Sequence, residues 1–497
     1  MFKIRVRVVI GVMIFFGYFL IYIVRYNLSV HIIDMVQISK REEFYMPYNG
    51  TFLNGIYTGA RSGILDLISW DDMNVARIFA AYHIGYCICF PIFHNVGDRL
   101  GPKWVIGIAG LISGILNCLT PAAAYSNFWA LFFVRTIKGF CAGAMQPSMV
   151  QILRHWVPPV ERNHFMWAYC GITTGTFSTF LICAGVQYYS SWPIGFYISG
   201  GTQITWSVLW ILIVTDYPRL HPCISTEELT YLTDTIGNIF AIKLTNLQAP
   251  WTLILKSVSF WAVCILNFGY AWMIISVCIH GPIYYSKVVK YDIYQASVLT
   301  ALPFFLRLIL GTIVIQTFHW YKHNRKFKRI KNIRKYFIVV SHVLPGMIVA
   351  FSWFLPVVPG PVLLTIAVAL TAAGMDLTLD LCYELTPTFV NSLHTVIKII
   401  GHTSGIIVSL CVGQVTQKYK NIPVTWKHIW CFHATVLFIS GFIFLIWGET
   451  EIQPWHYSRK REHHKVNINR NLSLMSNIIE VDEDAGSMQT RKSQMIL

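Results

Sequence analysis

The chain has 497 residues, of which 55% are hydrophobic and only 12% are charged. Soluble domains carry about 25% charged residues, so this composition excludes a soluble globular protein and indicates many membrane spans. The net charge of +16 falls largely in loops predicted on the cytoplasmic side, so it reflects topology, and no nucleic-acid partner is expected. The twelve cysteines lack a CxxC pair and metal-ligand spacing; they are interpreted as packing residues, and no metal site is expected.

Twelve apolar stretches are long enough to cross a bilayer, which needs about 20 residues per helix. These stretches are 8–32, 75–96, 104–124, 127–150, 164–187, 192–214, 257–281, 293–318, 335–357, 361–386, 392–415 and 427–448. The first has no small-residue cleavage site and is interpreted as a retained helix rather than a signal peptide. The pattern predicts an all-α membrane protein with twelve transmembrane helices and both termini on one side.

Basic residues set the orientation of these spans. They cluster before the first span, between the eighth and ninth spans (322–335), and after the last span (459–461). All three clusters fall on the same side, which predicts that both termini are cytoplasmic. The loop 33–74 then faces the lumen or the extracellular space, and its sequon at Asn49 is a predicted glycosylation site.

The spans divide six and six around a polar segment of mixed charge. We therefore predict a first six-helix bundle at 1–214, a cytoplasmic linker at 215–256, a second six-helix bundle at 257–448 and a disordered cytoplasmic tail at 449–497. Two bundles joined in this way are the layout of a transporter built from repeated halves.

Arg25 is the only charged residue between Arg7 and Asp34, so it lies inside the first span. A cation there costs roughly 2.5–3.5 kcal/mol on insertion scales. Such a residue usually faces a polar cavity, and a guanidinium suits carboxylate and phosphate groups. We interpret Arg25 as an anion-binding residue; pairing with a structural carboxylate is the alternative.

The heptapeptide 97–103, Gly-Asp-Arg-Leu-Gly-Pro-Lys, is predicted as a short loop between the second and third spans. Its charged residues, Asp98, Arg99 and Lys103, would lock the two bundles as a gating loop. In this position the motif resembles that of the major facilitator superfamily. Further stretches resemble the anion/cation symporter family within it, which includes sialin, vesicular glutamate transporters and sodium/phosphate cotransporters. These stretches are 25–30, 70–71, 85–86, 135–147, 156–162, 191–193, 301–303, 448–449 and 453–455.

The resemblance implies the major facilitator fold, two six-helix bundles that give alternating access to a central site. It also implies that Arg25 holds the substrate anion and that Arg135 in the fourth span takes part in coupling. At 1.5 Å per residue both arginines sit at similar depth, so they could face one cavity, although a structural role for Arg135 stays open. The predicted substrate-binding residues are Arg25, Arg135, Tyr22, Tyr86, Tyr270 and Arg307.

The chain departs from its relatives at several of these positions. Lys138 and Ala142 stand where many proton-coupled members carry carboxylates, and Tyr270 corresponds to the arginine of the glutamate transporters. Proton coupling through the usual residue is therefore not supported.

Other charged and titratable residues within the spans bear on coupling. Asp376 could form an ion pair with Lys398 in the neighbouring span, or take part in coupling. Glu384 is expected to be solvated near the cytoplasmic interface. His83 and His402 are predicted near the cavity, where a lone histidine is usually a packing residue rather than a proton relay.

The predicted function is secondary active or facilitative transport of a small anion, inorganic phosphate or an organic carboxylate. The alternative is a transport-inactive relative that acts as a sensor or interaction protein. The chain has no HExxH, GxSxG or Walker A motif, so an enzyme is not expected. No cofactor is expected; a co-transported sodium ion, a proton or neither stays open. We expect a monomer in the plasma membrane or in a lysosomal or vesicular membrane.

Overall fold

The computed structural model describes residues 5–36, 68, 70–241, 249–324, 330–355, 360–374, 381–382, 384–386, 389–419 and 422–456. This part of the chain is helical, apart from one isolated parallel bridge between Val36 and Ile68. Ten helical segments in it are long and apolar enough to cross a membrane. Two further predicted spans lie in the 29-residue helix α2 and in the shorter apolar helix Gly360–Gly374. The prediction of an all-α membrane protein is confirmed.

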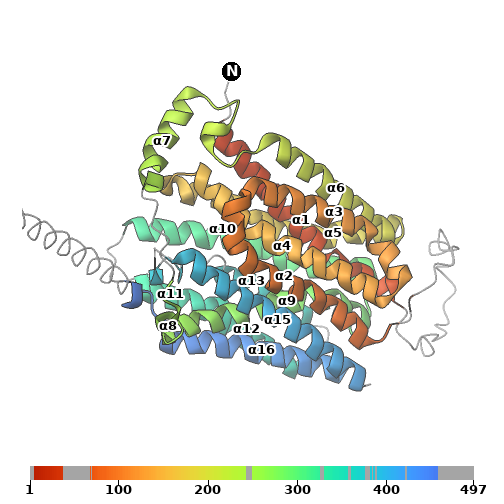
Figure 1. Cartoon of the computed structure of the whole chain (residues 1–497). Helices are drawn as coiled ribbons and strands as arrows, with labels where there is room; N and C mark the ends of the chain where they lie inside the picture. Colours follow the sequence, from red (N-terminus) through yellow and green to blue (C-terminus); the bar gives the residue numbers. More distant parts are fainter. Residues whose placement is uncertain are drawn as a thin grey trace, which may run out of the picture.

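The helices form two sets, which Figure 1 shows one above the other, with α15 and α16 (blue) in the lower set. The first set comprises α1 (Val6–Met35), α2 (Asp72–Leu100), α3 (Pro102–Ser126), α4 (Phe128–Trp156), α5 (Cys170–Tyr189) and α6 (Trp192–Ile213). The second set comprises α9 (Val258–Lys287), α10 (Ile293–Asn324), α11 (Ile330–Ile338), α12 (Leu344–Phe351), α13 (Gly360–Leu370), α15 (Val390–Lys418) and α16 (Ile422–Trp447). We call these sets the first and the second bundle.

The predicted loop at 97–103 is wrong in length. Helix α2 continues to Leu100 and α3 begins at Pro102, so Gly101 alone joins them. Its φ of 81° is a value that glycine adopts at no steric cost, and the following proline is suited to the first turn of a helix. Asp98 and Arg99 therefore belong to α2, and their side chains lie outside the described residues. The backbone N–H of Lys103 donates, at 2.7 Å, to the carboxylate of Asp216 in the segment that follows α6.

The predicted linker contains a helix that its polar composition did not reveal, α7 (Thr226–Ala241). It lies at the end of the molecule where the N-terminus is found (Figure 1). The carboxylate of Glu228 on α7 accepts hydrogen bonds from the backbone N–H groups of Val6 (3.0 Å) and Arg7 (3.2 Å). The Arg7 guanidinium also pairs with Glu161 at 2.7 Å. The first N–H groups of a helix have no partner within it, so α7 caps α1.

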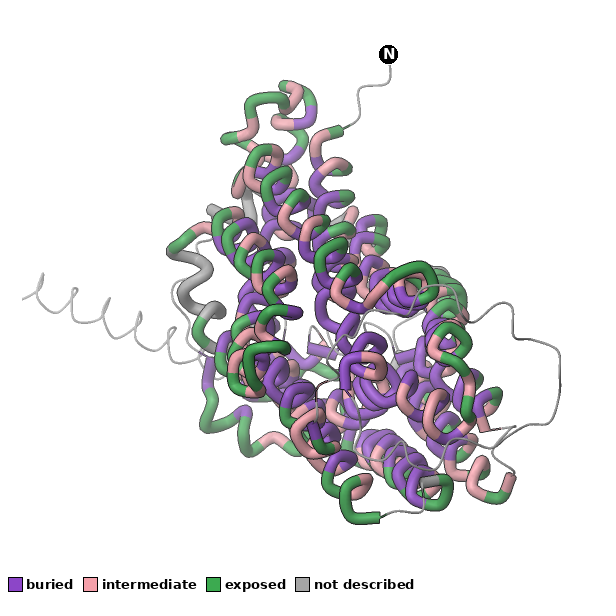
Figure 2. The backbone as a smooth tube through the Cα atoms, turned by 90° about the vertical axis from the view of Figure 1, so that its right-hand side faces the viewer, coloured by how far each residue is buried: buried purple, intermediate pink, exposed green. Residues whose placement is uncertain are grey.

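We call the end at which α1 begins the inner end, which the sequence predicts to be cytoplasmic, and the opposite end the outer end. At the outer end one hydrophobic core runs through both bundles and includes Leu28, Phe180, Met273 and Phe304. Figure 2 shows the buried segments in the interior and exposed turns outside. Toward the inner end the core divides in two.

Each bundle has its own core toward the inner end. In the first bundle it includes Ile14, Met149 and Trp210. In the second bundle it includes Phe260 and Leu393. Because the core that runs through both bundles lies at the outer end, the described structure is closed there.

Polar contacts also join the bundles at the outer end. The Lys287 ammonium lies 3.6 Å from the carboxylate of Asp72, and the Gln417 amide donates to Asp71 at 3.1 Å. These pairs connect α2 of the first bundle with α9 and α15 of the second. Surface ion pairs of this kind contribute at most about 1 kcal/mol, so the shared core carries most of the closure.

Candidate solute-binding site

Arg25 lies in α1, where its side chain is enclosed by tyrosines. The residue is 5% exposed, and its guanidinium carbon lies 5.5 Å from the ring centroid of Tyr22, 4.9 Å from that of Tyr26 and 5.5 Å from that of Tyr82. The buried Nε has no hydrogen-bond partner among the residues that the structure describes. Aromatic faces attract a cation, but they do not neutralise its charge, so the guanidinium keeps its capacity to bind an anion.

Arg135 in α4 lies against the same tyrosine cluster. It is 2% exposed, and both of its terminal nitrogens are 3.4 Å from the backbone carbonyl oxygen of Arg25. Its guanidinium carbon is 5.1 Å from the ring centroid of Tyr82, which therefore lies beside both arginines. The structure brings these two arginines together from separate helices, in keeping with their similar predicted depth.

The second bundle contributes a third arginine. Arg307 in α10 is 5% exposed, donates from Nη2 to the hydroxyl of Tyr270, and lies 5.4 Å from the centroid of that ring. The thiol of Cys278 on α9 is within electrostatic range of both Arg25 and Arg307. The structure thus places cations from both bundles around one region.

None of these three arginines has a carboxylate partner within 4 Å in the described part of the chain. Buried charges in proteins are normally paired, because an isolated ion loses its hydration. Three guanidinium groups that have no acidic partner among the described residues form a region of positive potential that suits a negatively charged solute.

Tyr86 joins this region to the interface between the bundles. Its hydroxyl donates to the side-chain carbonyl of Gln146 at 2.7 Å. Its ring stacks on His402 of α15, with centroids 3.6 Å apart. His402 in turn meets His83 of α2, Nδ1 to Nδ1, at 3.3 Å. The two histidines, which were predicted individually, are thus in direct contact across the two bundles.

Lys138 lies inside the first bundle, where its partner among the described residues is an amide rather than a carboxylate. It is fully buried, and its ammonium donates to the side-chain carbonyl of Asn117 at 2.5 Å. Asn27 and Ser199 complete the cluster through hydrogen bonds of 2.8 to 3.2 Å with Asn117 and with each other. An amide therefore takes the place of the carboxylate partner that a buried lysine would require.

Two other sequence expectations have different outcomes. Asp376 lies outside the described residues, so its pairing with Lys398, which is half-buried in α15, stays a prediction. The expectation that Glu384 is solvated is met only in part, because its side chain is 18% exposed but also forms an ion pair. Its carboxylate accepts hydrogen bonds from Nε and Nη2 of Arg334, at 3.0 and 2.7 Å, and the arginine side chain is only 4% exposed.

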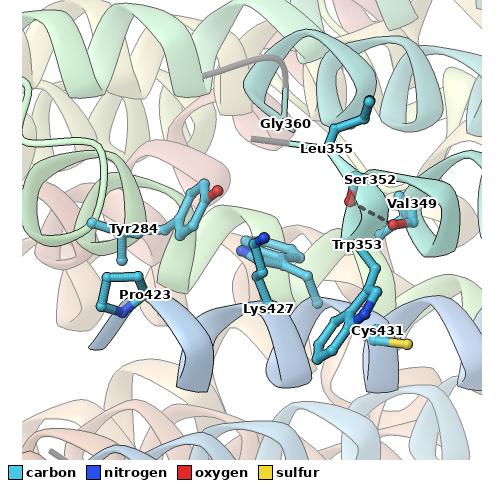
Figure 3. Close-up of a pocket in the computed structure, with 11 residues that line it drawn as sticks. Tyr284, Val349, Ser352, Trp353, Leu355, Gly360, Pro423, Lys427 and Cys431 are labelled. Atoms are coloured by element: carbon cyan, nitrogen blue, oxygen red, sulfur yellow. Dashed lines mark hydrogen bonds between the residues drawn. The ribbon is translucent and has the colours of Figure 1, made fainter. Parts of the chain in front are cut away.

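Figure 3 shows a small hollow elsewhere, at the outer end of the second bundle between α9, α12 and α16. Tyr284, Trp353 and Lys427 line it. Its volume of about 20 Å³ is close to that of one water molecule. A hollow of this size is too small for an organic anion.

Sequence reasoning missed three residues of this region, Tyr26, Tyr82 and Gln146. Tyr26 directly follows Arg25, but adjacent helical residues point in different directions, so adjacency gave no reason to expect a contact. Tyr82 is four residues before Tyr86, and that spacing places both on one face of α2. This was the available signal.

Comparison with known proteins places the chain among transporters. Residues 14–413 match the Major Facilitator Superfamily. Sialin of Ovis aries is 23% identical over 465 residues, covering 90% of this chain and 90% of that protein. Vesicular glutamate transporter 2.2 of Danio rerio is 26% identical over 460 residues, covering 90% of this chain and 74% of that protein.

Among solved structures, a D-xylose–proton symporter superposes with a TM-score of 0.63 at 13% identity, covering 89% of this chain and 98% of that one. At this identity the likeness shows a shared fold and carries no information on the solute.

Proposed function

This chain belongs to the Major Facilitator Superfamily and is a multi-pass membrane transporter rather than an enzyme, and we propose that it moves a small anion by alternating access. The anion is inorganic phosphate or an organic carboxylate. Sialin and the vesicular glutamate transporters among its relatives fit this class. The proposed location is the plasma membrane or the membrane of a lysosomal or vesicular compartment.

One observation carries the proposal. Arg25 and Arg135 lie together, almost fully buried, and neither has a carboxylate partner in the described structure. Two like charges in a low-dielectric region repel each other, and a bound anion relieves that repulsion. Arg307, with its hydroxyl partner Tyr270, adds a third cation from the second bundle. Tyr22 and Tyr86 supply aromatic walls and a hydroxyl.

The closed outer end supports alternating access. One shared core seals the two bundles at the outer end, and the inner ends have separate cores. A solute at Arg25 would exchange with the inner compartment in this state. Separation of the outer contacts would then expose the same site to the opposite compartment. This is the exchange that a two-bundle transporter performs.

The test is uptake by proteoliposomes that contain the full chain. Labelled phosphate, sialate, glutamate and urate are offered in turn, with a sodium gradient, a proton gradient, a membrane potential or none. We expect flux of at least one anion in the wild type and a loss of at least tenfold in Arg25→Ala. Arg77→Ala is the matched control, because Arg77 is an exposed arginine on α2 bonded to Asn74.

Equal uptake by the Arg25→Ala and Arg77→Ala variants would remove Arg25 from the site. No flux of any anion, in protein that elutes as a single folded species, would contradict anion transport. It would favour the transport-inactive sensor instead.

A further inference from the structure

His83 and His402 make a direct contact between the two bundles. His83 lies on α2 and His402 on α15, 319 positions apart in the chain, and their Nδ1 atoms are 3.3 Å apart. They are 2% and 8% exposed. Such a contact needs one hydrogen between the two nitrogens, so one ring donates and the other accepts.

The local packing depends on this contact. Gly405 faces the His83 ring, and a Cβ atom at that position would lie only 2.5 Å from the imidazole. On the other side, His402 stacks on Tyr86. The imidazoles are thus fixed in position where α2 and α15 lie against each other.

The number of protons on the pair decides whether the contact can form. Two neutral rings carry two ring protons, and one Nδ1–H donates to the other Nδ1. One added proton makes one ring an imidazolium, and the second ring still accepts. A further proton leaves no lone pair on either ring, so the hydrogen bond is lost and two like charges face each other. Separated rings, in contrast, can each take a proton independently.

The surroundings of the pair are cationic or neutral in the described part of the chain. Arg25 of α1 is within electrostatic range of both rings, Arg135 of α4 is near His83, and Lys398 of α15 is near His402. Helix α9 presents the amide of Asn267, which donates to the Ile397 carbonyl of α15 at 3.0 Å. Tyr82 and Tyr86 face the pair from α2.

An anion at Arg25 changes this balance. It neutralises the nearest positive charge, and an additional proton on the histidines then meets less repulsion. By linkage, proton binding to the pair favours anion binding by the same factor. The two bind together and separate together.

We propose that His83 and His402 form the proton-binding site that couples this transporter to a proton gradient; the inference rests on the proposed anion transport. Opening of the outer end separates the rings, so both can be protonated, and the pair takes up its second added proton from the outer compartment together with the anion. Closure restores the contact seen here, which tolerates only one added proton, so the other proton and the anion are released to the inner compartment. Proton and anion move in the same direction, from outer to inner side.

The experiment uses full-chain proteoliposomes with the membrane potential clamped at zero and a trapped pH-sensitive dye. Labelled phosphate, sialate, glutamate and urate are the probes. If one proton moves per anion, a gradient of one pH unit supports accumulation up to about tenfold. We expect wild-type uptake to rise with the gradient, and each transported anion to carry a proton.

His83→Asn and His402→Asn test the pair itself. Asparagine keeps a polar group at the position of Nδ1 but takes no proton, so the ratio of uptake with and without the gradient should fall to about one. His280→Asn is the matched control, because His280 is a buried histidine of α9 packed against Trp426 and away from this contact. It should keep the wild-type ratio.

Several results would overturn the proposal. Arg25-dependent uptake in the wild type that ignores the proton gradient would remove proton coupling and leave anion transport in place. A wild-type ratio in both histidine variants would place the proton elsewhere. If the variants elute as aggregates, the number of protons transported per anion by the wild type is the deciding measurement. A value of zero refutes the inference. No flux of any anion in the wild type would remove both proposals.

Discussion

Gly405 allows α15 to approach α2 at the histidine contact, and its replacement by alanine should open the outer end. The added Cβ would lie 2.5 Å from Nδ1 and Cε1 of His83. Those atoms belong to a buried ring rather than to the free end of a flexible side chain. The imidazole and its helix must therefore move.

The size of the effect follows from the geometry. Ordinary contact begins near 3.4 Å, so the ring must retreat by about 0.9 Å, the difference between 3.4 and 2.5 Å. A shift of this size away from α15 is enough to take the 3.3 Å contact between His83 and His402 beyond hydrogen-bond distance. Overpacking costs about 1–3 kcal/mol and a lost hydrogen bond about 1 kcal/mol. A bias of about 2 kcal/mol against the closed outer end shifts the equilibrium roughly thirtyfold.

Hydrogen exchange followed by mass spectrometry measures this shift. In Gly405→Ala, amides in 72–83 and 405–417 should exchange faster than in the wild type, because water enters between α2 and α15. Gly185→Ala in α5 is the matched control, since a Cβ there meets nothing within 4 Å. Equal exchange in both variants would refute the assignment of this contact as part of the closed outer end.

Two further predictions concern the inner and outer faces. Glu228→Ala should lower the melting temperature by a few degrees, because it leaves the buried Arg7 with one carboxylate partner and removes the cap of α1. Glu227→Ala changes an exposed neighbour and should leave the melting temperature unchanged. Equal melting temperatures in the two variants would contradict the docking of α7 on α1. Asn49→Gln should lose the mass of one glycan after expression in a secretory host, and unchanged electrophoretic mobility would count against glycosylation at this sequon.

The spans were predictable because hydrocarbon thickness and hydropathy fix them with little help from tertiary structure. The first predicted span, 8–32, lies within α1, which runs from Val6 to Met35. The family was predictable because the number of spans and the short motifs placed between them are visible in the sequence. Helix α7 was not predicted because its sequence is polar, and it is held by Glu228 and Tyr231 against α1 and Glu161 rather than by an apolar face alone.

The candidate site was only partly predictable. Arg25 could be identified as a single charge in an apolar span, and the residue count along each helix placed Arg135 at a similar depth, which is consistent with their proximity. The contact between His83 and His402 could not be predicted, because the two residues are 319 positions apart and the rotation of their helices about their axes is set by packing. The ion pair of Glu384 was not predicted for a related reason, because its partner Arg334 lies on another helix.

A site formed by arginines that have no acidic partner in the described part of the chain should be stabilised by the anion that it transports. At 4 Å and an effective dielectric constant of 20, one guanidinium–anion pair contributes about 4 kcal/mol before desolvation. A ligand at one hundred times its dissociation constant stabilises the folded protein by about 2.7 kcal/mol. The melting temperature of the detergent-solubilised wild type should therefore rise by a few degrees with the correct anion.

This measurement needs neither flux nor an imposed gradient, so it separates binding from transport. Phosphate, sialate, glutamate and urate are compared at equal ionic strength, because a general salt effect would act on any arginine. The rise should be absent in Arg25→Ala and retained in Arg77→Ala, since the exposed Arg77 already bonds Asn74. An anion that stabilises both variants equally is bound elsewhere, and such a result would contradict the assignment of Arg25 as the residue that holds the solute.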